Sequence, residues 1–259
     1  MNEKIIEKIK YPSPNPNIML SLITYLSNGL KVKGFLAEPV KEGKYDGFVY
    51  LRGGIKSVGM VRIGRIIQFA SQGFVVIAPF YRGNQGGEGN EDFAGDDRYD
   101  AVAAINILRN HHKVDHERIH LFGFSRGGVM ALLAGIIDKK VRSITTWGGV
   151  TDMFLTYVER EDLRRMMKRV IGGTPTKYPA RYKWRTPLFQ LEQISAPVLI
   201  IHGVKDNNVS IEHAYRLEKR LNDLDKHVES WYFEQFTHYF PPKDNRETLA
   251  RLCEWMKKQ

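Results

Sequence analysis

Residues 118–130 read RIHLFGFSRGGVM, and this stretch decides the fold. Its first half is a short apolar run typical of a buried strand, and VMALLAGII at 129–137 is typical of a helix. Between them, residues 123–127 match the pattern G-x-S-x-G at a strand-to-helix turn. Small residues on both sides allow a serine to occupy a sharp, exposed turn at the positive end of a helix. The stretch therefore predicts a nucleophilic serine at position 125.

The rest of the chain repeats this alternation of strand and helix. Apolar runs typical of parallel strands covered on both faces lie at 46–52, 73–79, 141–147 and 196–203. The expected helices are 59–72, 99–112, 127–137, 210–224 and 245–258. Asp100 and Ser210 are the expected helix N-caps, and Asn28-Gly29 predicts a tight hairpin turn between two further strands. We expect one α/β domain: a mainly parallel sheet with helices on both faces, opened by an antiparallel hairpin.

Residues 151–192 interrupt the alternation and are longer than one helical crossover needs. We expect them to form a small helical cap, with a helix at 152–171, over the carboxyl ends of the strands, where open α/β sheets bind ligands. From Glu159 to Arg185 the cap carries nine basic and three acidic residues, whereas 88–100 holds six acids and one arginine. A solvated helical face is the more common reason for such a basic run, and an anionic partner or substrate is the alternative.

Composition excludes several classes of protein. The 259 residues are 42% hydrophobic and 26% charged, which is typical of a globular chain and excludes a disordered or low-complexity one. No apolar run is long enough to span a membrane, and the first residues lack the apolar core of a secretory signal. The single cysteine, Cys253, fits a reducing cytoplasm. Despite a net charge of +10, the acidic stretch and the lack of a binding motif argue against a nucleic-acid partner.

A serine nucleophile needs a base and an acid to orient that base. Asp206 lies just beyond the run APVLIIHG, and His238 follows the run HVESWYFE. The order Ser, Asp, His, with the acid and the base after later strands, suits a catalytic triad. Asp152, after the run VRSITTWGG, is the alternative acid, although a helix N-cap is its more common role. The positions of the other histidines favour structural roles: His111, His112, His202, His213 and His227.

One competing motif is present. Residues 116–120 spell H-E-x-x-H, a zinc signature that needs both histidines on one face of a helix. This segment runs instead into the strand that leads to Ser125, where histidines four residues apart are too far from each other to share a metal. We therefore interpret the motif as a chance match and expect no metal.

The tetrahedral intermediate of acyl transfer needs N–H donors aimed at its oxyanion. The backbone N–H of Arg126, directly after the nucleophile, is the first candidate. The second is Gly54, in the run Leu51-Arg52-Gly53-Gly54 after an earlier strand. The glycine-rich run at 82–89 has neither dinucleotide-binding nor P-loop spacing, so no organic cofactor is expected.

Four motifs, at 79–89, 114–128, 185–209 and 236–240, resemble in sequence and order the catalytic domain of the prolyl oligopeptidase family of serine peptidases. The resemblance implies an α/β-hydrolase fold with Ser125, Asp206 and His238 as nucleophile, acid and base. It also aligns residues 52–54 with the HGG oxyanion motif of the family. Two positions depart from the family pattern: Arg52 replaces the usual histidine, and Thr237 stands where glycine commonly precedes the catalytic histidine.

These features predict a serine hydrolase that acts through an acyl-enzyme on carboxylic esters or small acylated peptides, leaning to a carboxylesterase. The residues before the core are too few for the propeller of larger family members. An aminopeptidase or acylpeptide-type peptidase on short peptides is the alternative, and a non-catalytic binding protein on a hydrolase scaffold is another. The residues expected to shape the substrate pocket are Arg52, Tyr81, Phe154, Tyr157, Trp184 and Tyr239.

Overall fold

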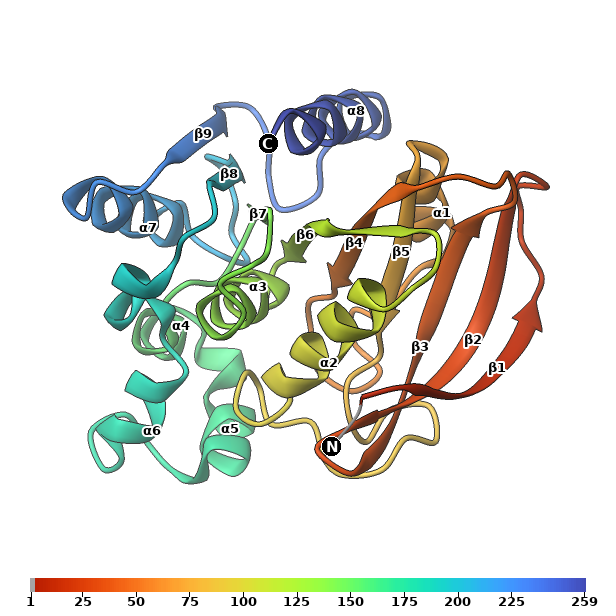
Figure 1. The fold of residues 1–259 in the computed structure, drawn as a ribbon. Helices are drawn as coiled ribbons and strands as arrows, with labels where there is room; N and C mark the ends of the chain where they lie inside the picture. Colours follow the sequence, from red (N-terminus) through yellow and green to blue (C-terminus); the bar gives the residue numbers. More distant parts are fainter. Residues whose placement is uncertain (1–2) are drawn as a thin grey trace.

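One nine-stranded sheet organises residues 3–259, the part of the chain that the computed structural model describes (Figure 1). Its strand order is β1-β2-β3-β5-β4-β6-β7-β8-β9. The first three strands run antiparallel to their neighbours, and the pairs from β5–β4 onward are parallel. The strands are β1 (Ile5–Tyr11), β2 (Ile18–Ser27), β3 (Leu30–Pro39), β4 (Tyr45–Leu51), β5 (Phe74–Pro79), β6 (Val114–Phe124), β7 (Ser143–Trp147), β8 (Val198–Gly203) and β9 (Val228–Phe233).

Helices cover both faces of the sheet (Figure 1). The buried side chains of α2 (Arg98–Arg109), α3 (Gly127–Ile137) and α7 (Glu212–Asp223) belong to one hydrophobic core. Those of α1 (Ile63–Ser71) and α8 (Pro242–Lys258) belong to a second core on the opposite face. Every residue of β5 and β8 is buried, as expected for strands packed between two helical layers. The predicted α/β-hydrolase fold is confirmed.

The expected hairpin is present, with Asn28 at φ 48° and Gly29 at φ 83°, as a type I′ turn requires. Both expected helix N-caps are wrong. Asp100 lies inside α2, where its carboxylate is buried and accepts hydrogen bonds from Arg82 and Ser27. Ser210 donates to Glu159 Oε1 instead, and α7 begins two residues later.

The segment 151–192 contains short helices rather than the expected helix over 152–171. They are α4 (Met153–Glu159), α5 (Arg164–Met167), a π-helical turn at Lys168–Gly172, and α6 (Pro179–Trp184), with 3-10 turns at Glu161–Leu163, Pro187–Phe189 and Leu191–Gln193. Helix α4 ends because the backbone of Arg160 leaves helical geometry. The guanidinium of Arg164 donates hydrogen bonds to the carbonyl oxygens of Tyr157 and Val158, which the end of the helix leaves free.

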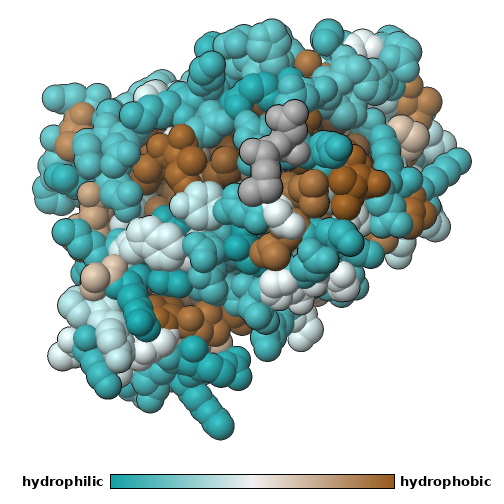
Figure 2. All heavy atoms as spheres, turned by 60° about the horizontal axis from the view of Figure 1, so that its bottom comes forward, coloured by the Kyte–Doolittle hydropathy of each residue, from teal (hydrophilic) through white to brown (hydrophobic). Residues whose placement is uncertain are grey.

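The face that carries this segment is mainly hydrophilic, with apolar patches separated by polar residues (Figure 2). Across residues 3–259, no helix has both the length and the apolar character needed to cross a membrane.

Candidate active site

Ser125 occupies the turn between β6 and α3 with φ 56°, in the left-handed region that non-glycine residues rarely adopt. Three backbone hydrogen bonds hold this strained turn: Ser125 N–H donates to Trp147 O (3.1 Å), and Ser125 O accepts from Gly128 N–H and Val150 N–H (both 2.9 Å). Strand and helix cross closely here, because a Cβ on Gly123 would lie 2.1 Å from Gly127 O. The glycines of G-x-S-x-G are therefore required by packing, and the serine is held in an unusual conformation of the kind found at functional sites.

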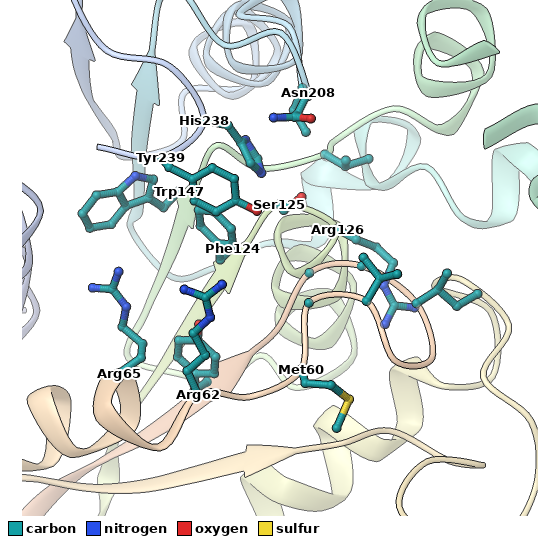
Figure 3. A pocket seen from close by; sticks show the side chains of 18 of the residues that line it. Met60, Arg62, Arg65, Phe124, Ser125, Arg126, Trp147, Asn208, His238 and Tyr239 are labelled. Atoms are coloured by element: carbon teal, nitrogen blue, oxygen red, sulfur yellow. The ribbon is translucent and has the colours of Figure 1, made fainter. Parts of the chain in front are cut away.

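Asp206 and His238 follow the neighbouring strands β8 and β9 and meet beyond their carboxyl ends. His238 Nδ1 lies 2.6 Å from Asp206 Oδ2, and both side chains are buried. The other carboxylate oxygen, Oδ1, accepts the backbone N–H groups of Asn208 (2.8 Å) and Val209 (2.9 Å). His238 and Ser125 line one cavity, in which the imidazole extends towards the serine (Figure 3).

The charge state of Asp206 follows from these contacts. Burial alone would raise the pKa of this carboxyl, but hydrogen bonds from His202, His238 and the N–H of Val209 lower the pKa well below its ordinary value. Asp206 is therefore an anion at neutral pH, as the partner of a catalytic imidazolium must be.

The alternative acid, Asp152, has another role. Its Oδ1 accepts the N–H groups of Phe154 and Leu155 at the start of α4, and its Oδ2 lies 3.1 Å from Arg216 Nη1. It is the N-cap of that helix.

Two other histidines lie near the triad residues. His202 Nε2 is 2.9 Å from Val209 O and 3.5 Å from Asp206 Oδ2, which steadies the acid loop. His213 lines the cavity, but burial, with smaller effects of His202 and Arg216, lowers its pKa to about 3. His213 is therefore uncharged at neutral pH.

The H-E-x-x-H match has no metal-binding geometry. Residues 116–120 lie in strand β6, as expected, where His120 instead contacts Ser143 Oγ (2.8 Å) and Asp46 Oδ2 (3.2 Å). His116 pairs only with its neighbour Glu117.

Beneath Ser125 lies a set of residues that we call the buried arginine network: Arg52, Tyr81, Glu91, Asp97 and Arg126. The side chains of Arg52 and Arg126 are 1% and 2% exposed. Arg52 Nη2 lies 3.1 Å from Glu91 Oε1, Arg126 Nη2 donates to the same oxygen, and Arg126 Nη1 lies 3.0 Å from Asp97 Oδ2. Both guanidiniums stack over the ring of Tyr81, at 5.0 and 4.7 Å from its centre. Both arginines thus have carboxyl partners within the protein.

Glu91 joins the two segments expected to bear the oxyanion donors. Besides the two arginines, its Oε2 accepts the backbone N–H of Lys56 (2.7 Å) and the amide of Asn84 (3.0 Å). One carboxylate therefore fastens the loop after β4 to the turn after β6.

That loop passes directly against Ser125. A Cβ on Gly53 would lie 2.7 Å from Ser125 Cβ and 3.2 Å from Ser125 Oγ. Gly54 has φ 65°, and a Cβ on it would lie 2.3 Å from Val58 O. Gly53, Gly54 and Arg126 all line the cavity of Ser125. The residues expected to supply the N–H donors are brought together, and the direction of each donor stays a prediction.

Of the six residues expected to shape the substrate pocket, one lines the cavity. Tyr239 lines the cavity and is 67% exposed, but the other five do not. Arg52 and Tyr81 belong to the buried arginine network, because Glu91 draws the guanidinium inward. The remaining three pack elsewhere on the 151–192 segment: Phe154 and Tyr157 against Tyr182, and Trp184 beneath the guanidinium of Arg98.

The cavity has a volume of about 750 Å³, in the range of small-molecule sites. One wall is aromatic, formed by residues that include Tyr50, Phe122, Phe124, Trp147, Tyr239 and Phe240, and Thr156, Leu163 and Met166 face it from the 151–192 segment. Sequence reasoning missed Arg62, Arg65 and Arg246, which also line the cavity. A signal existed for the first two: cations at the start of a helix oppose its dipole and need another reason to be there.

Comparisons with known proteins identify relatives of this chain. Residues 61–259 match the sequence pattern of the prolyl oligopeptidase family. The "uncharacterized peptidase YtmA" of Bacillus subtilis (strain 168) is 65% identical over 254 residues, which span 98% of this chain and 99% of YtmA.

Two solved structures share the fold. The acylaminoacyl peptidase of Pyrococcus horikoshii superposes with a TM-score of 0.80 at 22% identity, over 94% of this chain and 42% of its own. Acetyl xylan esterase 1 from Thermoanaerobacterium sp. JW/SL YS485 superposes with a TM-score of 0.75 at 14% identity, over 96% of this chain and 87% of its own. At these identities the likeness shows the α/β-hydrolase fold alone.

Proposed function

This chain belongs to the prolyl oligopeptidase family and is a serine hydrolase, and we propose that it cleaves carboxylic esters and short acylated peptides with Ser125, His238 and Asp206 as its triad. The observation that carries the assignment is the 2.6 Å contact between Asp206 Oδ2 and Nδ1 of His238, which lines the same cavity as the strained Ser125.

The proposed chemistry has two stages. His238 Nε2 takes the proton of Ser125 as Oγ attacks the carbonyl carbon, and the developing oxyanion is held by the N–H of Arg126 and an N–H of the Gly53-Gly54 loop. The tetrahedral intermediate collapses, the leaving group takes the proton from His238, and the acyl group stays on Oγ. Water then repeats the sequence and releases the acid. Asp206 holds the imidazole in the correct tautomer and stabilises the imidazolium.

The cavity favours small substrates, and we lean to a carboxylesterase. Its volume of about 750 Å³ suits an acyl group and a small alcohol or amine rather than a long chain. An aminopeptidase or acylpeptide-type activity on short peptides is the second candidate, favoured by the peptidases among its relatives.

We also propose that the enzyme works in the reducing cytoplasm. Its only cysteine, Cys253, is buried in α8, and burial raises the pKa of the thiol to about 12. It therefore takes no part in the proposed reaction.

The test combines an active-site label with matched substrates. A fluorophosphonate probe is expected to label wild type and Ser57→Ala, which changes an exposed serine outside the cavity, and not Ser125→Ala. Initial rates on p-nitrophenyl esters should fall by about 10³-fold or more in Ser125→Ala. Turnover of aminoacyl p-nitroanilides with a kcat/KM comparable to that of the esters would favour the peptidase candidate. Labelling or full turnover by Ser125→Ala would overturn the triad, and a wild type that neither labels nor turns over would favour a binding protein.

A further inference from the structure

The cavity around Ser125 is lined by cations and by no anion. Among residues 3–259, its lining includes no aspartate or glutamate and no lysine, but five arginines: Arg62, Arg65, Arg126, Arg160 and Arg246. Such a one-sided set of charges gives the cavity a positive field that concentrates negatively charged small molecules.

Two of these five arginines are already paired. Arg126 is bound to Glu91 and Asp97 in the buried arginine network. Arg160 lies 2.7 Å from Asp162 Oδ2 and donates to the carbonyl of Asn208. Because Arg126 and Arg160 already have carboxyl partners in the protein, they contribute little to binding an anion.

The other three have no carboxylate of residues 3–259 within salt-bridge distance. Arg65 donates from Nη1 to two neutral amide oxygens, Asn245 Oδ1 at 2.5 Å and Gln68 Oε1 at 3.4 Å. It is half-buried, and its burial together with the nearby charge of Arg62 lowers its pKa. A partly desolvated guanidinium beside a second one is unfavourable unless an anion joins them.

Their positions reinforce this reading. Arg62 precedes α1 and Arg65 lies in its first turn, where the helix dipole disfavours cations and favours anions. Arg246 approaches from α8 on the same side of the cavity lining, next to Asn245. Figure 3 shows Arg62 and Arg65 extending side by side from the start of α1 towards Trp147 and Tyr239, on the side of the cavity where Ser125 and His238 lie.

We infer that Arg62 and Arg65, assisted by Arg246, form a subsite for a carboxylate, so that the preferred substrates are esters or short acylated peptides that carry one. The forked guanidinium matches the two oxygens of a carboxylate. The aromatic wall contacts the uncharged part of the molecule. This inference rests on the proposed function, since it names the substrate class of the same site.

The experiment compares two esters of nearly equal shape. The acyl chain of 4-nitrophenyl hydrogen succinate ends in a carboxylate, and that of 4-nitrophenyl 4-methylpentanoate ends in an isopropyl group of similar shape. Since a hydrogen bond to a charged group contributes about 1.5–3 kcal/mol, kcat/KM for the carboxylate ester should exceed that for the neutral ester by about tenfold or more, after the uncatalysed rate is subtracted. The 4-carboxyphenyl and 4-acetylphenyl esters of 4-methylpentanoic acid test the same preference in the leaving group.

The double variant Arg62→Gln/Arg65→Gln should reduce that preference by about tenfold or more. It should unfold at a temperature no lower than wild type, because it removes cations from a helix N-terminus. The matched control is Arg169→Gln, which removes one charge from an exposed arginine outside the cavity and should leave the preference within about twofold of wild type.

The outcomes separate the two proposals. If wild type shows no preference in either ester pair, or if the double variant keeps the wild-type preference, the carboxylate subsite is wrong while the triad stands. An equal loss of preference in Arg169→Gln would assign it to the overall charge and would also overturn the subsite. Turnover that survives Ser125→Ala would instead overturn the proposed function.

Discussion

The arginines near Ser125 form two groups that differ in their partners. Arg52 and Arg126 lie in the buried arginine network, where both contact Glu91 and Arg126 also contacts Asp97. Arg62 and Arg65 line the cavity, neither has a salt bridge to a carboxylate of residues 3–259, and Arg65 donates to two neutral amide oxygens. The first pair holds the backbone near the nucleophile in place, and the second pair leaves its charge available to a ligand. The partner of an arginine, and not its place in a motif, therefore decides what it does.

The largest effect is expected from Glu91→Gln, which removes the shared carboxylate of the network. Two buried guanidiniums would lose their main anion, so the free energy of unfolding should fall by about 3–5 kcal/mol. kcat should fall with it, because the loop after β4 and the turn after β6 lose their common anchor. Urea denaturation and ester turnover measure the two effects.

Glu88→Gln is the matched control for Glu91→Gln, since Glu88 lies in the same loop but is exposed and pairs with Lys31 at 3.8 Å. Its effect on the free energy of unfolding should stay within about 1 kcal/mol. If both substitutions lowered the free energy of unfolding equally, the difference between buried and exposed carboxylates would be contradicted.

A second prediction exchanges arginine for lysine in each group. Arg126→Lys cannot reach Glu91 and Asp97 with separate nitrogens, so the free energy of unfolding should fall by about 2 kcal/mol or more. Arg62→Lys keeps a charge at an exposed position and should change the free energy of unfolding by about 0.5 kcal/mol or less. Chemical denaturation of both variants, side by side, checks this. Tolerance of lysine at position 126 would contradict the role of the forked guanidinium.

A third prediction concerns pH. Burial, with the repulsion of Asp92, Asp100 and Glu91, raises the pKa of Asp97 from 3.8 to about 7, despite the attraction of Arg126. Between these values the folded protein holds a proton that the unfolded chain has lost, so this group makes the free energy of unfolding fall as the pH rises from about 4 to 7. The buried Oδ1 of Asp97, which has no hydrogen-bond partner, is consistent with that direction.

Asp97→Asn removes this dependence. The advantage of wild type over the variant in free energy of unfolding should therefore shrink from pH 5 to pH 8, as measured by urea denaturation at one-unit intervals. A difference that stays constant, or grows, over this range would show that Asp97 is charged throughout.

The smallest effect is expected from salt. Arg62 is exposed and Arg65 half-buried, so their attraction for a carboxylate is screened as the Debye length falls from about 30 Å at 0.01 M to about 3 Å at 1 M salt. kcat/KM for the succinate ester should fall several-fold over this range, and that for the neutral ester should change little. Parallel curves for the two esters would place the anion away from these arginines.

Local sequence signals predicted most of the elements and pointed to the three residues of the candidate triad. Alternating apolar runs specify strands and helices because each must bury a face, and Asn28-Gly29 specifies its turn through backbone geometry. Ser125 was evident because its glycine neighbours are required where strand and helix cross. Asp206 and His238 were found because each follows a strand whose end lies at the same edge of the sheet.

Predictions that depended on a side chain's partner were wrong more often. Asp100 was expected to cap a helix, but Arg82, 18 residues away, holds it inside one. Arg52 and Tyr81 were expected in the pocket, but Glu91, distant in sequence from Arg52, keeps the guanidinium buried above the Tyr81 ring. Long side chains can reach in several directions, and no local pattern indicates which one is taken.

Periodicity and turns that only certain residues can make were enough to predict an α/β sheet and the position of the candidate nucleophile. The family and its α/β-hydrolase fold were predicted from the resemblance of four motifs. Only the tertiary structure shows which arginines have carboxylate partners and which face the cavity. Glu91 and Asp97 lie between β5 and α2, whereas the cavity arginines lie near the N-terminal ends of α1 and α8. The division depends on how these segments come together around Ser125. Electrostatic pairing acts through space over a few ångströms, and the residues that it joins can lie anywhere along the chain.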